Sequence, residues 1–164
     1  MCYNSYFPIM SESLQAELKQ RKPFPRVTAE ALLSVLRTAA VLEHQLTEAL
    51  KPYGITHTQY NVLRILRGAG ADGLCGREVG ERMVSRVPDV SRLLDRMEDT
   101  GLIGRERDPL DRRHVTARIT RKGLALLDQA TPQLEVVERE RAGQIPAGQL
   151  KQLIEVLNTV RGNR

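Results

Sequence analysis

The residues best suited to chemistry in this chain are basic, and they gather in one short segment. Residues 105–122 hold seven basic side chains against three acidic ones, and the chain of 164 residues has a net charge of +5. The basic residues are Arg105, Arg107, Arg112, Arg113, Arg118, Arg121 and Lys122. A solvated loop rarely needs this asymmetry, whereas neutralisation of a phosphate backbone does.

Two further arginines lie on a predicted helix just before this segment. Apolar residues recur there at i, i+3, i+4 and i+7, which predicts one buried face; they are Val90, Leu93, Leu94 and Met97. Pro88 suits the first turn of this helix, and Gly101 suits its end. The other face carries Ser91, Arg92 and Arg96.

These arginines have two interpretations. As ordinary surface residues, Arg92 and Arg96 pair with Asp95, Glu98 or Asp99 along the same helix. Their position after a turn and before a basic hairpin favours contact with DNA instead.

The preceding elements are predicted to be helices. Thr28 begins a helix whose apolar residues recur at gaps of 3 and 4, a seam typical of helix packing or a dimer interface. Gly54 lies beyond its end. A buried helix capped by Thr58 runs to Arg67, and a short helix covers 76–84.

The following elements are a hairpin and two helices. Residues 102–107 and 115–120 are predicted strands. A helix begins near Gly123, with Pro132 as a kink or break, and the segment 143–146 separates it from a last amphipathic helix. Three helices followed by a basic hairpin predict a mainly α winged helix-turn-helix with a small β-wing, whose second helix enters the major groove.

Residues 59–123 resemble the multiple-antibiotic-resistance-regulator (MarR) family of bacterial transcription factors. The resemblance lies in SRLLDRM at 91–97, DRR at 111–113 and ITRKG at 119–123. It implies a DNA-binding transcriptional regulator, a repressor released by a small-molecule effector. An enzyme is not expected, because the sequence offers no Ser/His/Asp or Cys/His grouping, phosphate-binding glycine loop or metal-ligand cluster. A redox- or metal-responsive regulator, or an interaction module without DNA binding, is the alternative.

The resemblance also implies roles for individual residues. Ser91 and Arg92 reach base edges or phosphates in the major groove, and Arg96 lies on the same face. Arg113 enters the minor groove, while Asp111 orients the wing by pairing with an arginine. The full predicted DNA-binding set is Arg86, Pro88, Ser91, Arg92, Arg96, Asp111, Arg112 and Arg113. For Asp111 and Arg113 the simpler reading is a turn with a local ion pair.

The start of the recognition helix departs from the family pattern. Arg86 to Asp89 are bulkier and stiffer than the family's usual small polar residues. Base preference at this position is therefore open.

The family further implies an obligate homodimer. Its domain organisation places an N-terminal arm at 1–27 and a MarR-type domain at 28–164. Within that domain, 28–53 and 124–162 are the interlocked dimerisation helices, and 55–122 is the winged-helix lobe. The two-fold axis predicts a pseudopalindromic double-stranded DNA site.

An effector pocket is expected between the dimerisation helices and the DNA-binding lobe. Tyr53, His57, Tyr60 and Arg64 fall on segments that line it in the family. An arginine with a tyrosine and a histidine suits a small aromatic or phenolic acid. Core tyrosines beside a surface arginine are the competing interpretation.

Composition and scattered residues exclude several other classes. With 41% hydrophobic and 27% charged residues the chain is globular, and with 4% aromatics a base-stacking platform is not expected. No apolar run is long enough for a membrane span, and the N-terminus lacks a secretory pattern, so a cytoplasmic protein is predicted. Cys2 and Cys75 do not match the family's sensing position, and His44, His57 and His114 give no metal cluster. No cofactor, metal or catalytic residue is expected.

Overall fold

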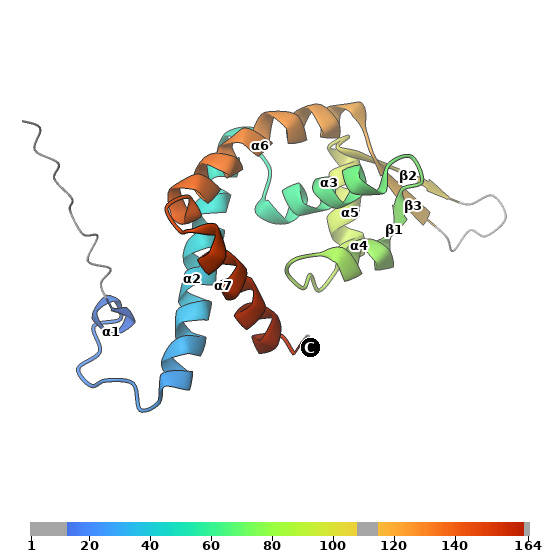
Figure 1. Cartoon of the computed structure of the whole chain (residues 1–164). Coiled ribbons are helices and arrows are strands. Elements are labelled where there is room, and N and C mark those ends of the chain that lie inside the picture. Colours follow the sequence, from blue (N-terminus) through green and yellow to red (C-terminus); the bar gives the residue numbers. More distant parts are fainter. Residues whose placement is uncertain (1–12, 108–114, 163–164) are drawn as a thin grey trace, which may run out of the picture. The chain divides into compact units, whose positions relative to one another are not determined.

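The computed structural model describes residues 13–107 and 115–162, and Figure 1 shows the elements in chain order. The chain forms two units, residues 1–44 and 45–164. In the described part of the first unit, α1 (Leu14–Glu17) is capped by Ser13, whose Oγ accepts from the N–H of Ala16 at 3.3 Å. α1 ends at Glu17, and Lys19 just beyond it adopts a left-handed φ of 52°.

The long helix α2 (Val27–Leu50) begins one residue before Thr28. Its N-terminal half leaves its apolar seam uncovered, with Leu32 52% and Leu36 66% exposed. An ion pair of 3.1 Å joins Glu17 Oε2 to Arg37 Nε within the same unit. As predicted, α2 ends before Gly54. The short 3-10 helix η1 (Lys51–Tyr53), which contains Pro52, follows it and ends at Gly54.

The second unit contains α3 (His57–Ala69), which begins earlier than predicted. Thr56, not Thr58, is the cap: its Oγ1 accepts from the N–H of Gln59, and the Gln59 side chain accepts from the N–H of Thr56 at 2.9 Å. This reciprocal pair satisfies two otherwise unpaired N–H groups of the first turn. Tyr60, Val62, Leu63 and Leu66 of α3 are buried.

Next come β1 (Leu74–Cys75), α4 (Gly76–Arg82) and α5 (Val90–Asp99). The wing consists of β2 (Ile103–Arg107) and β3 (Val115–Ile119). The strands form one antiparallel sheet in the order β1-β3-β2. Ala117 of the central strand β3 lies between Leu74 of β1 and Arg105 of β2.

Strand β1 was not predicted from the sequence. It has two residues, too few for an alternating pattern to show. Gly73 before it has a φ of +69°, and a Cβ there would lie 2.5 Å from the carbonyl oxygen of Ala117. A glycine is required because the backbone turns tightly against β3.

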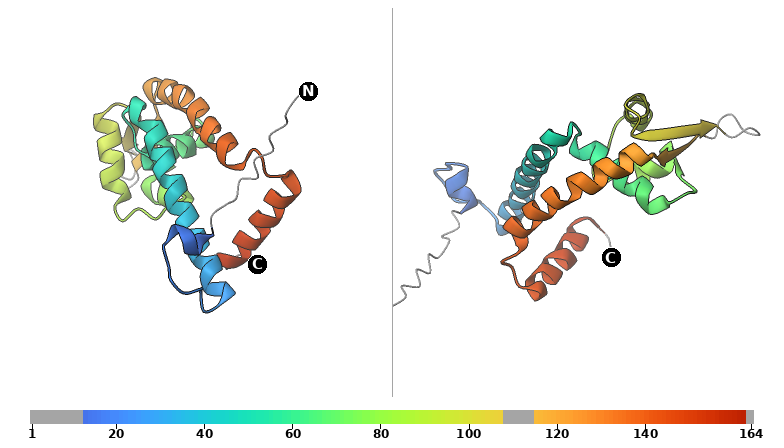
Figure 2. Two further views of the ribbon diagram at one scale, coloured as in Figure 1. Left: turned by 90° about the vertical axis from the view of Figure 1, so that its left-hand side faces the viewer. Right: turned by 90° about the horizontal axis from the view of Figure 1, so that it is seen from above.

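The helix α6 (Arg121–Ala142) follows the sheet and runs through Pro132 without a break, as Figure 2 shows. Thr120 caps it by accepting from the N–H of Gly123 at 3.0 Å. Buried residues of α6 extend only to Leu134.

The segment 143–146 separates α6 from α7 (Ala147–Val160), as predicted, and α7 contains no buried residue. Among the described helices, none has the length and apolar character needed to cross a membrane. The core of the second unit gathers where α3, α4, α5 and α6 meet the sheet.

Candidate nucleic-acid interface

The pair α4 and α5 forms a helix-turn-helix whose connection is fixed at both ends. The N–H of Val84 donates to Asn61 Oδ1 of α3 at 3.1 Å. Asp89 caps α5, because its Oδ1 accepts from the N–H of Arg92 at 2.9 Å. Pro88 therefore lies before the cap, not in the first turn of the helix as predicted.

The two faces of α5 differ as the sequence predicts. Leu94 and Met97 are buried against the core, and Gly101 ends the segment with a φ of 70°. Ser91, Arg92 and Arg96 are exposed on the opposite side. Among the described residues, neither arginine forms an ion pair, so both guanidinium groups are available to a ligand.

Two of the three acids of α5, Asp95 and Glu98, are paired with a residue of the wing. Arg105 Nη2 lies 2.5 Å from Asp95 Oδ1 and 2.7 Å from Glu98 Oε2. Arg105 Nε donates to Glu98 Oε2 at 2.7 Å, and the Arg105 backbone N–H donates to Glu98 Oε1 at 3.1 Å. The sequence left open whether Arg92 and Arg96 pair with these acids. In the structure the acids pair with Arg105 instead.

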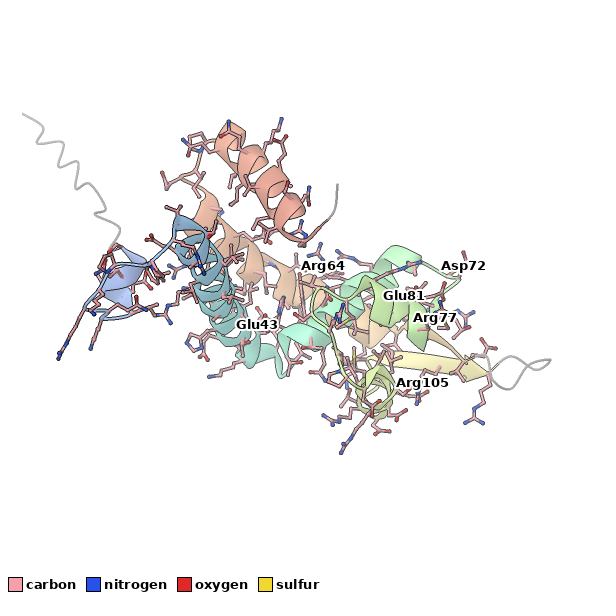
Figure 3. The ribbon with its side chains drawn as sticks, turned by 90° about the horizontal axis from the view of Figure 1, so that it is seen from below. Glu43, Arg64, Asp72, Arg77, Glu81 and Arg105 are labelled. Atoms are coloured by element: carbon pink, nitrogen blue, oxygen red, sulfur yellow. The ribbon has the colours of Figure 1, made fainter. Side chains whose placement is uncertain are left out.

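This contact also affects the charge of Arg105. Burial lowers the pKa of its guanidinium, but hydrogen bonds to Glu98 and Asp95 outweigh that effect and raise the pKa above its ordinary value. Arg105 is permanently charged and only 23% exposed. Figure 3 labels it beside α5 and the wing strands. From the sequence, Arg105 is one of the basic residues of the wing. Its contact with Asp95 and Glu98 could not be predicted without knowing how β2 packs against α5.

Other basic residues of the segment 105–122 also hold the fold. Arg118 Nη1 pairs with Glu106 Oε2 at 2.8 Å, and its Nε donates to the carbonyl oxygen of Ala71 at 2.7 Å. Lys122 Nζ donates to the carbonyl oxygen of Thr100 at 2.8 Å. The hairpin charge is therefore less available to a ligand than its residue count suggests.

The predicted DNA-binding residues are divided between the described and the undescribed parts of the chain. Asp111, Arg112 and Arg113 lie outside the described residues, as do His114 and Cys2. Arg86 and Pro88 are exposed on the α4–α5 connection.

On α4, Arg77 Nε pairs with Glu81 Oε1 at 2.9 Å, and the hydrogen bond to Glu81 raises the pKa of Arg77. Figure 3 shows this pair on the outer side of α4.

A cavity of about 450 Å³ lies beside α5. It is lined by Cys75, Gly76, Arg77, Ser91, Leu94, Arg105 and Val115. Cys75 is partly buried, and its N–H donates to Glu78 Oε2 at 2.8 Å. Within the described ranges, no group of three or more His, Cys, Asp or Glu side chains could hold a metal ion.

The predicted effector residues are only partly brought together. Tyr60 and Arg64 line a hollow of about 240 Å³ between α3 and α6, and Tyr60 Oη lies 3.1 Å from Thr131 Oγ1. The other lining residues are Arg67, Thr131, Leu134, Glu135 and Glu138. Tyr53 packs against the core instead, and neither it nor His57 belongs to the lining.

Comparison with known proteins identifies the family. The model of the MarR family matches residues 53–114. The transcriptional regulator YkoM of Bacillus subtilis is 31% identical over 118 residues, which are 72% of this chain and 71% of YkoM. The chain belongs to the MarR family. MarR-family proteins are DNA-binding transcriptional regulators that bind DNA as dimers.

Solved MarR-family structures have the same winged-helix fold. MepR of S. aureus in complex with DNA is 22% identical, with a TM-score of 0.73 over 80% of this chain and 96% of MepR. CouR of Rhodococcus jostii RHA1 bound to p-coumaroyl-CoA is 25% identical, with a TM-score of 0.68 over 84% of this chain and 95% of CouR.

Proposed function

We propose that this MarR-family regulator is a homodimeric repressor that binds a pseudopalindromic operator through the exposed face of α5. The observation that carries this proposal is the solvent-facing row of Ser91, Arg92 and Arg96, opposite the buried Leu94 and Met97. A helix with this division places its basic side in the major groove, about 12 Å wide, and keeps its apolar side in the core.

The residues around α5 have supporting roles in this proposal. Arg86 and Pro88 are exposed just before the helix and approach the phosphate backbone. Arg113 enters the minor groove, Arg112 contacts a phosphate and Asp111 orients the wing, as in the family pattern. Phosphate contacts fix the register of the protein, and contacts of Arg92 with base edges provide the specificity.

The dimer is proposed from the apolar surfaces of α2 and α7. Each is a helix whose apolar residues remain exposed in the single chain, as for Leu36 and Val156. Large exposed apolar faces are typical of subunit contacts. A two-fold axis between copies then presents two α5 helices about one DNA turn apart, ~34–36 Å, to a pseudopalindrome.

Selection of bound sequences from random duplex DNA by the purified protein tests this function directly. An inverted repeat with half-sites about one turn apart is the expected product. Arg92→Ala then weakens binding to the selected operator by about 1–3 kcal/mol and relaxes base preference, because a base contact is lost. Arg113→Ala should weaken binding to a similar degree.

Arg139→Ala is a matched control, because Arg139 is an exposed arginine of α6, far along the chain from the winged lobe. It removes the same charge and should leave operator affinity within about twofold. Wild-type protein that selects no sequence would contradict the proposed function, and equal effects of Arg92→Ala and Arg139→Ala would contradict the assignment of α5.

The effector is proposed to be a small phenolic acid that binds in the hollow between α3 and α6. Arg64 supplies a cation for the carboxylate, and the Tyr60 hydroxyl and Thr131 hydroxyl supply hydrogen-bonding partners. CouR, which is bound to p-coumaroyl-CoA, is a relative with an aromatic acyl ligand.

Titration of the protein–operator complex with 4-hydroxybenzoate and p-coumarate tests the effector proposal. Release of the operator by either acid, lost in Arg64→Gln but retained in Arg139→Gln, is expected because only Arg64 lines the hollow. Release that is equally strong with Arg64→Gln would place the effector elsewhere.

A further inference from the structure

The exposed side of α5 carries acids as well as arginines. Asp95 follows Ser91 by four residues, so the two lie one turn apart on the same face, and the Asp95 side chain is 52% exposed. Glu98 is the next acid along and is 38% exposed. Without a counter-charge, both carboxylates would stand close to the phosphates that surround a helix in the major groove, and they would repel them.

Arg105 is placed to remove that repulsion. Its guanidinium lies within 2.7 Å of both carboxylates, and its backbone N–H also donates to Glu98. These contacts join β2 to α5, so that one side chain both offsets negative charge on the helix and links the helix to the wing. Charge-assisted hydrogen bonds with this fork geometry are the strongest that a guanidinium makes.

The arginine is also unlike the exposed arginines beside it. Arg92 and Arg96 form no ion pair within the described part of the chain, whereas Arg105 has both acids and is mostly covered. The Nε and Nη2 groups of Arg105 are engaged by these carboxylates, so a phosphate that approached them would have to break the pairs.

We propose that Arg105 is a positioning residue for operator recognition, which acts through Asp95 and Glu98 and does not itself contact DNA. It offsets part of the negative charge of Asp95 and Glu98 and holds α5 in a fixed position relative to the wing. The inference rests on the proposed binding of DNA by α5, and it assigns specificity to a residue outside the groove.

Arg105→Gln tests this role against Arg118→Gln. Arg118 is a matched control because it lies on the adjacent strand β3 and is also ion-paired, at 2.8 Å to Glu106. Its side-chain hydrogen bonds within the described residues go to Glu106 and to the carbonyl oxygen of Ala71, and neither belongs to α5. Both changes remove one positive charge from the wing. The probe is the operator selected by the wild-type protein, with a scrambled duplex of equal length as the non-specific competitor.

Arg105→Gln should lower affinity for the selected operator by about 10-fold to 100-fold, because hydrogen bonds to two charged groups are lost. Affinity for the scrambled duplex should change no more than in Arg118→Gln, so that the ratio of specific to non-specific binding falls. A role in phosphate contact would instead lower both affinities and reduce the salt dependence by about one unit of slope.

The double variant Arg105→Gln with Asp95→Asn supplies the decisive readout. Removal of the uncompensated charge should restore at least part of the affinity lost in Arg105→Gln, and a merely structural loss would not be rescued. If Arg105→Gln does not fold, Arg105→Lys replaces it in the comparison with Arg118→Gln. The lysine keeps the positive charge but lacks the planar guanidinium that contacts both carboxylates.

Equal effects of Arg105→Gln and Arg118→Gln on the operator, or no rescue by Asp95→Asn, would overturn the inference. Those results are separable from failure of the proposed function, because wild-type protein must first select an operator. If it selects none, the proposed function fails, and the measurements on Arg105 do not arise.

Discussion

The winged lobe buries its apolar residues, whereas the terminal helices leave theirs exposed. In the lobe, Leu63, Leu66, Val79 and Met97 are fully buried, and the described residues include no buried charged or polar side chain. In α7 no residue is buried, and Val156 is 59% exposed. The N-terminal half of α2 is similar, with Leu36 66% exposed.

In the proposed dimer, this difference separates the part of the molecule that folds from one chain from the part that requires a second copy. Burial of a large apolar side chain contributes about 1.5–3 kcal/mol, so the lobe gains its stability within one chain. The exposed faces of α2 and α7 contribute little until another surface covers them. In the proposed dimer, α2 and α7 of the partner supply that surface.

The largest predicted effect tests the terminal helices. Ile154 of α7 is 56% exposed and lies on the apolar stripe. In the proposed dimer Ile154→Asp buries an unpaired carboxylate, which costs about 3–5 kcal/mol of association free energy. Sedimentation equilibrium should show monomers at concentrations where the wild-type protein is dimeric.

Gln152→Asp is the matched control, since it adds the same charge at an exposed polar position of α7. It should leave the dissociation constant within about threefold. A wild-type monomer, or equal dissociation in both variants, would contradict the assignment of α7 to the interface.

The same contrast explains how far the sequence alone could predict the fold. The periodicity of α5 and the alternation of β3 are strong signals, and the structure confirms both elements. The two residues of β1 show no period, and the cap of α3 was predicted at Thr58, which lies inside the helix, whereas the cap is Thr56. Boundary errors of this size come from local hydrogen bonds that periodicity does not record.

The site was harder to predict than the fold. The exposed arginines of α5 follow from helical spacing, so Arg92 and Arg96 could be placed on one face from the sequence. The pairing of Arg105 with Asp95 and Glu98 requires the angle between β2 and α5, which is set by the packing of the core. Charge counting treated Arg105 and Arg118 as free cations, although each is held by a carboxylate.

A smaller effect is predicted for the lobe, where Met97 is fully buried. Met97→Ala leaves a cavity under α5 and should lower the free energy of unfolding by about 2–5 kcal/mol in a urea titration. Because this contact lies within one chain, the loss should be the same in the monomeric Ile154→Asp background. A loss that disappears in the monomer would mean that the lobe core itself depends on the second copy.

Val156→Ala in α7 sharpens the comparison as the counterpart of Met97→Ala. In the Ile154→Asp monomer it should change the free energy of unfolding by less than about 0.5 kcal/mol, because Val156 is already 59% exposed in the single chain. In the proposed dimer the same change removes buried methyl groups and should cost about 1–2 kcal/mol per protomer. The effect of Val156→Ala on the free energy of unfolding should therefore differ between the dimer and the Ile154→Asp monomer, whereas the effect of Met97→Ala should be the same in both. This difference separates a surface that requires a partner from a core that does not.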